Sequence, residues 1–453
     1  MIGNGTPALA AFQGYGVELE YMIVDRHQLS PVPIADQLLR AATDVFTSDV
    51  DRGLLGWSNE MALHVIEIKN RRPAAALESL PIAFQTEVRY INRILELFGA
   101  RLMPTAMHPW MDPRREMRLW PHANAELYQT YGRIFDCNSH GWANLQSMHI
   151  NLPFANDGEF ARLHAAVRLV LPILPALAAS SPIAEGSNTG FADFRMEAYR
   201  NNAQSIESIT GQVIPETVSS RADYERIILA PMYRDIAPHD PQHILQHEWL
   251  NSRGAIARFD RNAIEIRVID TQECPQADLA IAAATVAVVE ALYVAGPATR
   301  GSVSSALPLV AAGNVIVGNA TPTPQPTRGN AQPALAPQQE IGTDALAAIL
   351  LDCIRSADQA VIDDARYLAL IGFPGSQCTA HELWHHLIET IQRGDRKLPA
   401  LWHEPLQTIL EQGPLARRIL RAVDGDYSSR RLTAVYRQLC DCLQEGRMFM
   451  AAC

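Results

Sequence analysis

YGVELEYMIVD, residues 15–25, shows the two-residue alternation of a half-buried β-strand. Glu18 and Glu20 share one face, and the opposite face is apolar, with Tyr15, Val17, Leu19, Tyr21 and Ile23. The two carboxylates project from one face of a sheet, roughly 6.5–7 Å apart at the backbone. Burying both is costly unless a cation neutralises them. The strand is therefore either a solvated face or part of a site for hard ions such as Mg²⁺ or Mn²⁺.

Three further segments are predicted to be strands with polar groups on one face. They are EMALHVIEIK at 60–69, LQSMHINL at 145–152 and AIEIRVID at 263–270. In the second segment Ser147, His149 and Asn151 share a face, and in the third Glu265 and Arg267 do. Each segment alone has a structural explanation, because His149 could be a core histidine and Glu265 could form a ladder ion pair with Arg267.

Glu60 and Glu67 are seven residues apart, so in one regular strand they would face opposite ways. They reach a shared site only if a bulge or bend intervenes. The alternative is that one glutamate is solvated and the other forms a salt bridge. Taken together, the four segments present five glutamates, one histidine and one arginine, a pattern that unrelated solvated faces produce less readily.

Helical patterns fill the intervals between these strands and the end of the chain. The predicted helices cover 76–99, 158–180 and 276–295, and further helices follow residue 344. The predicted units are an α+β catalytic domain at 12–316, a Pro-rich linker or loop at 317–343 and a helical region at 344–453.

Composition excludes several classes of protein. A hydrophobic fraction of 48% excludes global disorder, and 38 basic against 49 acidic residues, with no dense basic run, argue against nucleic-acid binding. No signal peptide or membrane span is expected. Seven scattered cysteines indicate no disulfide framework, so we expect a cytoplasmic protein with small-molecule partners. The sequence leaves the oligomeric state open, and a homo-oligomer is compatible with it.

The chain resembles the glutamate–cysteine ligase type 2 family of carboxylate–amine ligases, in the wider glutamine-synthetase-like group. The matching stretches are GVELEYMIVD at 16–25, E-x6-E at 60–67, MPTAMHPW at 103–110, MHINLPF at 148–154, ALAASSPIAEGSNTGFADFR at 176–195 and AIEIRVIDTQE at 263–273. The resemblance extends over residues 12–295. Its most specific parts are the ASSP…G…TG…R block and E-x-R-x-x-D.

The resemblance implies an antiparallel sheet curved into a funnel-shaped active site, with helices packed outside. It also implies ATP and two or three Mg²⁺ ions as cofactors, with Mn²⁺ as an alternative. The implied metal ligands are Glu18, Glu20, Glu60, Glu67, His149 and Glu265.

By the same resemblance, Arg267 meets the γ-phosphate and forms the catalytic pair with Glu265. Arg195 meets a substrate carboxylate, and Asn151 joins it in substrate binding. Further ATP contacts are assigned to Arg258 and Arg261 of RGAIARFDR at 253–261, although both could equally be surface arginines. Many relatives have a second histidine where this chain has Ser147, and the Asn and Arg-x-Gly of their downstream helix are not recognisable here.

The implied reaction is ATP-dependent ligation of an acid, by resemblance glutamate, to cysteine or another amino compound, as in glutathione biosynthesis. Amide formation in water is uphill, so the carboxylate is first activated as an acyl phosphate. Metal ions and an arginine stabilise the charge on the transferred phosphoryl group. Two alternatives stay open. One is a phosphotransferase of the guanidino-kinase type, and the other is a non-catalytic regulatory relative.

Overall fold

An antiparallel sheet forms the centre of the part of the chain that the computed structural model describes, residues 8–295 and 341–451. Its eight strands are β1 (Gly16–Asp25), β2 (Asp49–Arg52), β3 (Leu55–Asn59), β4 (Val65–Asn70), β5 (Ala100–Met103), β6 (Ser147–Pro153), β9 (Ala255–Arg258) and β10 (Ala263–Asp270). Their order is β2-β3-β4-β1-β6-β10-β9, and β5 pairs with the second half of β1. Neighbouring strands are antiparallel, which confirms the predicted mixed helix and antiparallel-sheet fold.

Helices before the break in the described residues are α1 (Ala35–Thr43), α2 (Pro81–Leu95), α3 (Pro113–Glu116), α4 (Ala125–Ile134), α5 (His140–Ala143), α6 (Asp157–Val170), α7 (Leu174–Ala178), α8 (Phe194–Tyr199), α9 (Arg221–Tyr224), α10 (Ala230–Ile236) and α11 (Pro275–Ala295). After the break come α12 (Thr343–Ser356), α13 (Ala365–Ile371), α14 (Ala380–Arg393), α15 (His403–Gln412), α16 (Leu415–Val423) and α17 (Ser429–Glu445). Two-stranded ribbons are formed by β7 (Ile183–Ala184) with β8 (Ser187–Asn188) and by β11 (Val361–Ile362) with β12 (Cys378–Thr379).

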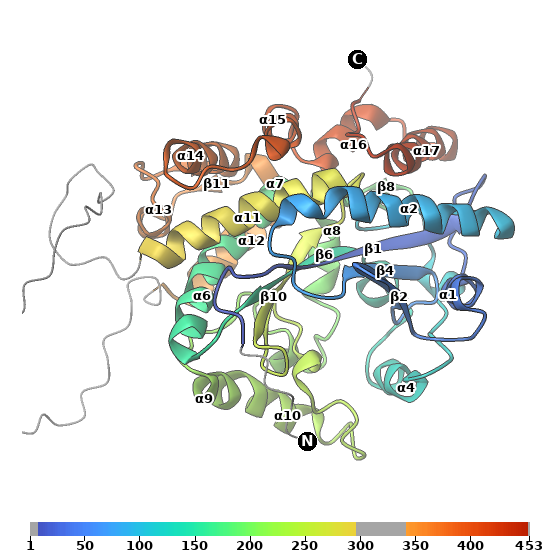
Figure 1. Cartoon of the computed structure of the whole chain (residues 1–453), viewed down its shortest axis with the longest axis horizontal. Coiled ribbons are helices and arrows are strands. Elements are labelled where there is room, and N and C mark those ends of the chain that lie inside the picture. The colour runs from blue at the N-terminus through green and yellow to red at the C-terminus, as the bar shows by residue number, and fades with distance from the viewer. Residues whose placement is uncertain (1–7, 296–340, 452–453) are drawn as a thin grey trace, which may run out of the picture.

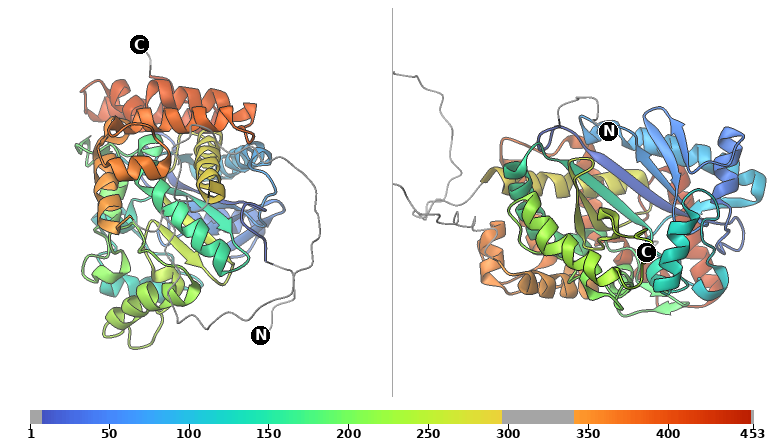
Figure 2. Two further views of the ribbon diagram at one scale, coloured as in Figure 1. Left: turned by 90° about the vertical axis from the view of Figure 1, so that its left-hand side faces the viewer. Right: turned by 90° about the horizontal axis from the view of Figure 1, so that it is seen from below.

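The helices form layers on one side of the sheet. Helices α2 and α11 lie directly over the strands, and α14 to α17 form a further row above them (Figure 1). On the other side, the strands are visible from below between α4 and the α9–α10 stretch (Figure 2). The sheet therefore has one face packed in the core and one face toward which functional side chains can point.

Strand β1 is the central strand of the sheet, and its predicted alternation is confirmed. Val17, Leu19, Tyr21 and Ile23 are fully buried in the main hydrophobic core. The first half of β1 pairs with β4 on one side and with β6 on the other, so its polar face borders both neighbours. A charge on this face is thereby surrounded by the side chains of three strands.

The prediction of one strand over 60–69 is wrong. Strand β3 ends at Asn59, the chain turns, and β4 begins only at Val65. Strands β3 and β4 then pair as a hairpin, in which Ser58 lies opposite Glu67. A bend does lie between Glu60 and Glu67, but it is a hairpin connection and not a bulge within one strand. The short β3, LGWSN, lacks the alternation that would have revealed it.

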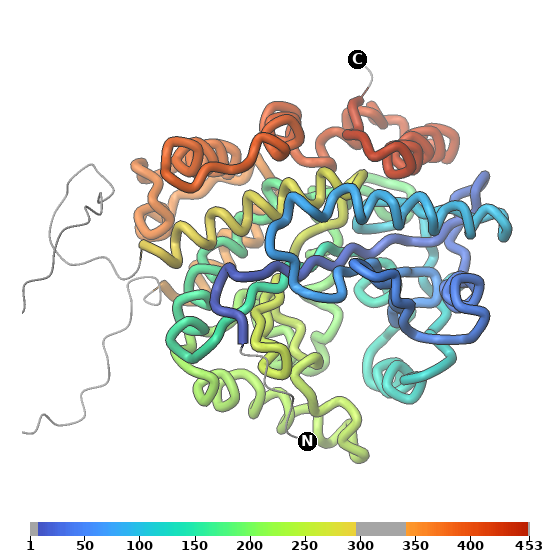
Figure 3. The backbone as a smooth tube through the Cα atoms, viewed as in Figure 1, coloured from blue at the N-terminus to red at the C-terminus, as the bar shows by residue number. Residues whose placement is uncertain are grey.

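Helices α12 to α15 share the main hydrophobic core with the sheet-bearing part. Residues of α12, α13 and α14 belong to the same buried cluster as β1 and α11. Helix α17 runs beside α2, although more than 330 residues separate them in sequence (Figure 3). Gln85 and Arg89 of α2 donate hydrogen bonds to backbone carbonyls at the end of α17. Residues 317–340 of the predicted linker lie outside the described part of the chain.

Two helical stretches, Asp157–Ala178 and Pro275–Ala295, have the length and apolar composition of a membrane span. Their most apolar windows are 89% and 72% buried within the protein. Helix α11 packs against α2, α6, α14 and α15, which accounts for its apolar residues on all sides. Both stretches therefore serve as core helices of this fold.

A buried ion pair joins the last helices to the end of the sheet. Arg418 of α16 and Glu273, three residues after β10, are both inaccessible to solvent and form a salt bridge. Arg418 also donates to the Phe449 carbonyl, and the Phe449 backbone N–H donates to Glu273. The pair thus fixes the C-terminal tail against the segment that follows β10.

Replacing Arg418 with methionine is expected to lower the free energy of unfolding by about 3–5 kcal/mol, because Glu273 is left as an unpaired buried charge. Urea unfolding followed by circular dichroism measures the change. Arg393→Ala, which removes an exposed pair with Glu389, is the matched control and should cost less than about 1 kcal/mol. Equal losses in the two variants would contradict the role given to the buried pair.

Candidate active site

The polar face of the sheet lines a cavity of about 590 Å³. Strands β1, β4, β6 and β10 contribute most of its charged side chains. An aromatic wall faces them, formed by Tyr128, Tyr131, Trp142, Tyr199 and Trp249. The hydroxyl of Tyr199 is buried and has no hydrogen-bond partner within the described residues. The cavity therefore offers both charged and aromatic groups to a ligand.

One row of polar side chains crosses four strands, β3, β4, β1 and β6, at the same level. Glu20 of β1 lies opposite Glu67 of β4. Ser58 donates to Glu67 at 2.6 Å, and Ser147 donates to Glu20 through its backbone nitrogen at 2.7 Å and its hydroxyl at 3.0 Å. Glu20 and Glu67 are 8% and 5% exposed, so donors of the protein replace most of the water around them. The row holds two carboxylates side by side in a nearly dry place.

A second row lies two residues further along on the same face, on strands β4, β1 and β6. Glu18 is opposite Lys69 of β4 and opposite His149 of β6. The Nδ1 atom of His149 is 3.1 Å from a Glu18 oxygen, and Lys69 forms an ion pair with Glu67. Asn151, predicted to bind substrate, donates to Glu18 at 3.2 Å. In this structure Asn151 therefore supports a candidate metal ligand.

Two groups of side chains could each hold a metal ion, and they share one residue. Glu18, Glu67 and His149 place ligand atoms within 4.8 Å of one another, and so do Glu20, Glu60 and Glu67. Carboxylate oxygens with one imidazole nitrogen suit Mg²⁺ or Mn²⁺. Five of the six predicted ligands are thus brought together. The donor set fits a pair of divalent ions that share Glu67.

The electrostatics of the acids favour the binding of a cation. Burial, and then the charges of Glu20 and Glu67, raise the pKa of the Glu60 carboxyl well above its ordinary value. Burial and the charge of Glu18 raise the pKa of Glu67 to about 7, although Lys69 opposes them. Burial also opposes ionisation of Glu18, but His149 and Lys69 outweigh it and hold the pKa of Glu18 below its usual range. Divalent ions would allow all these acids to be ionised.

Glu265, the sixth predicted ligand, lies apart from the two acidic groups and between arginines. Its carboxylate is 3.1 Å from Arg258 Nη1 and 3.0 Å from Arg267 Nε. All three side chains line the cavity. The structure therefore joins the predicted catalytic pair, Glu265 and Arg267, and adds Arg258 to it. Arg261 lies at the cavity margin, half exposed, 3.7 Å from Asp260.

A bulge in β10 sets the direction of these side chains. The register with β6 shifts between Ile266 and Ile269, so one extra residue lies in β10. Because of that residue, Glu265, Arg267 and Asp270 all face the polar side, although the last two are three residues apart. Two-residue alternation alone would have placed Asp270 on the opposite face.

Arg195, predicted to meet a substrate carboxylate, lines the cavity but already has partners inside the protein. Its Nη1 is 3.2 Å from Asp270, and its Nη2 donates to the Arg267 carbonyl at 2.7 Å. Its side chain is 2% exposed. The structure thus places Arg195 behind Arg267.

Sequence reasoning missed several groups at this site. Lys69 follows Glu67 by two residues, so the alternation of its strand could have revealed it. Asp270 was visible as the last residue of E-x-R-x-x-D, but no role was assigned to it. The aromatic wall carries no comparable signal, because its members come from loops and helices far apart in sequence.

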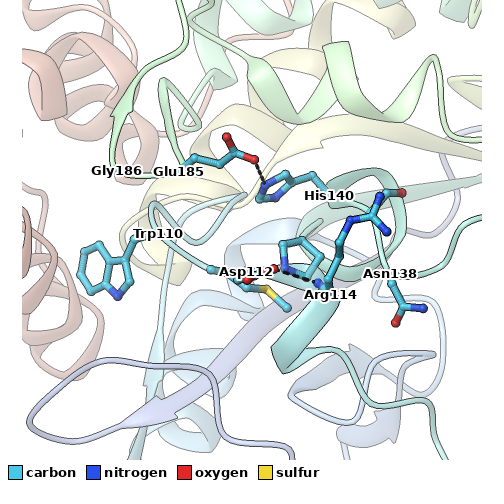
Figure 4. A pocket seen from close by; sticks show the side chains of 10 residues that line it. Trp110, Asp112, Arg114, Asn138, His140, Glu185 and Gly186 are labelled. Carbon is cyan, nitrogen blue, oxygen red and sulfur yellow. Dashed lines mark hydrogen bonds and ion pairs between the residues drawn. The ribbon is translucent and has the colours of Figure 1, made fainter.

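A second cavity of about 520 Å³ lies near α5 and the β7–β8 ribbon (Figure 4). Its lining includes Trp110, Arg114, His140 and Glu185, and the last two are 3.6 Å apart. None of the predicted site residues lines this cavity. The candidate chemistry therefore belongs to the acidic cavity.

Comparison with known sequences identifies relatives of the sheet-bearing part. The family described as "Glutamate-cysteine ligase family 2 (GCS2)" matches residues 15–301. An Archaeoglobus fulgidus protein named "Uncharacterized protein" is 35% identical over 276 residues, 61% of this chain and 74% of that protein. A Bradyrhizobium diazoefficiens protein named "Putative glutamate--cysteine ligase 2" is 26% identical over 61% of this chain. The match covers 58% of that protein, less than two thirds of its length.

Comparison with solved structures concerns the fold alone, because sequence identity is low. A Francisella tularensis glutamate–cysteine ligase, solved in complex with AMP, matches with a TM-score of 0.54 and 11% identity, covering 95% of this chain and 88% of that one. A bifunctional glutathione synthetase from Pasteurella multocida gives a TM-score of 0.53 and 14% identity, covering 95% and 52%. Since the family matches well over half of the chain, this protein belongs to glutamate–cysteine ligase family 2.

Proposed function

We propose that this protein is an ATP- and Mg²⁺-dependent carboxylate–amine ligase that activates glutamate and joins it to cysteine or another amino compound. One observation carries the proposal: two acidic ligand groups that share Glu67 lie in the same cavity as Arg258 and Arg267. Family membership supports the reaction class, and the printed name of the Bradyrhizobium relative supports glutamate and cysteine. The AMP bound to the Francisella enzyme supports a nucleotide substrate.

The two acidic groups would hold the ions, one through Glu18, Glu67 and His149 and the other through Glu20, Glu60 and Glu67. When bound, Mg²⁺ supplies positive charge against the phosphate oxygens of the nucleotide. Lys69 and Ser58 hold Glu67 in place between the two groups. Glu265 is a proposed further ligand, which would have to exchange at least one of its arginine partners for a metal.

Arg267 and Arg258 would meet the transferred phosphoryl group, since a guanidinium donates two parallel hydrogen bonds to phosphate oxygens. A carboxylate oxygen of the acid attacks the γ-phosphorus, and ADP leaves. The amine then attacks the carbonyl carbon of the acyl phosphate, inorganic phosphate leaves, and the amine loses a proton. The aromatic wall would limit the access of water, which otherwise hydrolyses the acyl phosphate.

Several finer features of the resemblance belong to this proposal. They are a glutamine-synthetase-like funnel, two or three ions per site, a substrate contact from Asn151, and ATP contacts from Arg261. A cytoplasmic location, with no nucleic-acid or membrane partner, is expected for a ligase that uses ATP and free amino acids.

A product screen tests the reaction itself. Purified protein is incubated with ATP, Mg²⁺, glutamate and a panel of amines, and mass spectrometry detects condensed products while phosphate release is followed. We expect an amide together with stoichiometric ADP and phosphate. A phosphorylated acceptor without an amide would instead indicate a phosphotransferase. No nucleotide turnover with any acid or amine would support the non-catalytic alternative.

Glu67→Gln is expected to weaken Mn²⁺ binding at both positions, because Glu67 belongs to both acidic groups. Even outer partners of a metal are worth 10–100-fold in affinity, so we expect a loss of at least about 100-fold. Electron paramagnetic resonance of free Mn²⁺ in the presence of a nonhydrolysable ATP analogue measures both affinity and stoichiometry.

The comparison variants for this experiment are Glu60→Gln, which belongs to one group only, and the exposed Glu225→Gln. Glu60→Gln should remove one ion, and Glu225→Gln should remove none. Two ions bound to Glu67→Gln with the affinity of the wild type would disprove the shared site.

Arg267→Lys keeps the positive charge but loses the fork that reaches two phosphate oxygens. Loss of one such donor in a transition state costs about 10²–10³ in kcat, so phosphate release should fall by that factor. The exposed Arg226→Lys serves as the control. Turnover of Arg267→Lys within threefold of the wild type would remove Arg267 from the phosphoryl-transfer step.

A further inference from the structure

Asp270, the last residue of β10, is fully buried and surrounded by donors. Its carboxylate accepts from the Ser180 backbone nitrogen at 2.8 Å, from the Ser181 hydroxyl at 2.8 Å and from Arg195 at 3.2 Å. Burial raises the pKa of the Asp270 carboxyl, but Arg195 and the serine donors oppose that shift and favour the ionised carboxylate. Asp270 is therefore an internal anion, and its side chain is joined to the cavity lining by the hydrogen bond from Arg195.

Arg195 connects this anion to the bulge of β10. While Nη1 faces Asp270, Nη2 donates to the backbone carbonyl of Arg267 at 2.7 Å. The guanidinium is planar, so the two contacts fix its orientation. Arg195 thus holds the backbone of Arg267, and the Arg267 side chain extends into the cavity to Glu265.

Asp193 is a second buried acid, close to Asp270. It is fully buried, accepts from the Met196 backbone nitrogen at 2.9 Å, and has its carboxyl group close enough to that of Asp270 for the charge of Asp270 to act on it. Two carboxyl groups can share a hydrogen bond only if one of them carries a proton. Burial, and then the charge of Asp270, raise the pKa of Asp193 well above its ordinary value. Arg195 and the donors around Asp270 favour the charge on Asp270, so Asp193 is the carboxyl that takes up the proton more readily.

We propose that Asp270, Arg195 and Asp193, here termed the aspartate–arginine bracket, hold the β10 bulge so that Arg267 points at the phosphoryl group; this rests on the proposed function. Arg195 is then a positioning residue, and no substrate carboxylate needs to reach it. Asp193 acts as a neutral hydrogen-bond donor to Asp270. The bracket assigns a role to the aspartate of E-x-R-x-x-D and to the arginine that ends the ASSP…R block.

The bracket also gives the C-terminal helices a connection to the site. The backbone nitrogens of Ala192 and Asp193 donate to the carbonyls of Arg355 and Ile354 at the end of α12, each at 3.0 Å. Helix α12 therefore supports the segment that carries Asp193. Displacement of this helix would break the backbone hydrogen bonds that hold Asp193. It would affect Arg267 only indirectly, through Asp270 and Arg195.

Two isosteric variants test the bracket, because they differ only in which carboxyl group becomes an amide. Asp193→Asn keeps a neutral donor toward Asp270, so its kcat for phosphate release should stay within about threefold of the wild type. Asp270→Asn removes the charge opposite Arg195, and the resulting misplacement of Arg267 should lower kcat by about 100-fold. It should also weaken Mg-ATP binding at least tenfold in calorimetry while leaving AMP binding unchanged. Equal effects of the two substitutions would overturn the proposal.

Arg195→Lys provides an independent test if Asp270→Asn does not fold. Lysine can keep the pair with Asp270 but cannot also reach the Arg267 carbonyl, so Mg-ATP affinity and kcat should fall together. A rise in KM for the acid alone, with unchanged ATP affinity, would mean that Arg195 binds substrate and that the bracket is wrong.

The bracket can fail separately from the proposed function. If the wild-type protein neither binds ATP nor releases phosphate, the ligase assignment fails. A crystal structure of Arg195→Lys then decides the bracket on geometry, because Arg267 should turn away from Glu265. An unchanged Arg267 side chain would overturn it.

Discussion

The site depends on a surplus of buried negative charge at one end of the cavity. Four glutamates lie on the β1 and β3–β4 side of the cavity: Glu18, Glu20, Glu60 and Glu67. On that side of the lining, Lys69 supplies a positive charge. Hydrogen bonds from serines can orient such acids but cannot neutralise them. The protein therefore keeps part of this cluster protonated, or fills it with cations. A fold that only needed stability would gain nothing from placing these acids together.

Local periodicity explains why much of this could be predicted. Alternation in β1, β6 and β10 is a property of each strand by itself, so it correctly placed Glu18, Glu20, His149 and Glu265 on polar faces. The antiparallel sheet with helices outside it was implied by the family resemblance. Lys69 could have been added by the same rule, since it shares the face of Glu67.

The rest of the site depends on a turn, a bulge and tertiary contacts, which strand periodicity does not predict. Glu60 reaches Glu67 across a hairpin turn. This turn was not predicted, because β3 is short and lacks a regular alternation. The bulge in β10 changes the face on which Asp270 lies, and one inserted residue leaves no mark in the hydrophobic pattern. Arg195 finds its partners only after the chain has folded. The resemblance therefore placed Arg195 at the site, and the tertiary contacts determine which groups it holds.

Charge is segregated along the sheet, and this arrangement restricts the ligands that fit. Glu265 is shared by Arg258 and Arg267, so the β9–β10 end of the cavity keeps a net positive charge while the β1–β4 end is acidic. A free nucleotide would place its phosphates against the arginines but leave the acids unneutralised, and free ions would do the reverse. A nucleotide that carries its divalent ions would satisfy both ends at once, because the acidic residues would hold the ions while the arginines meet the phosphates. The same geometry would leave the γ-phosphate next to Arg267, where an acid can attack it.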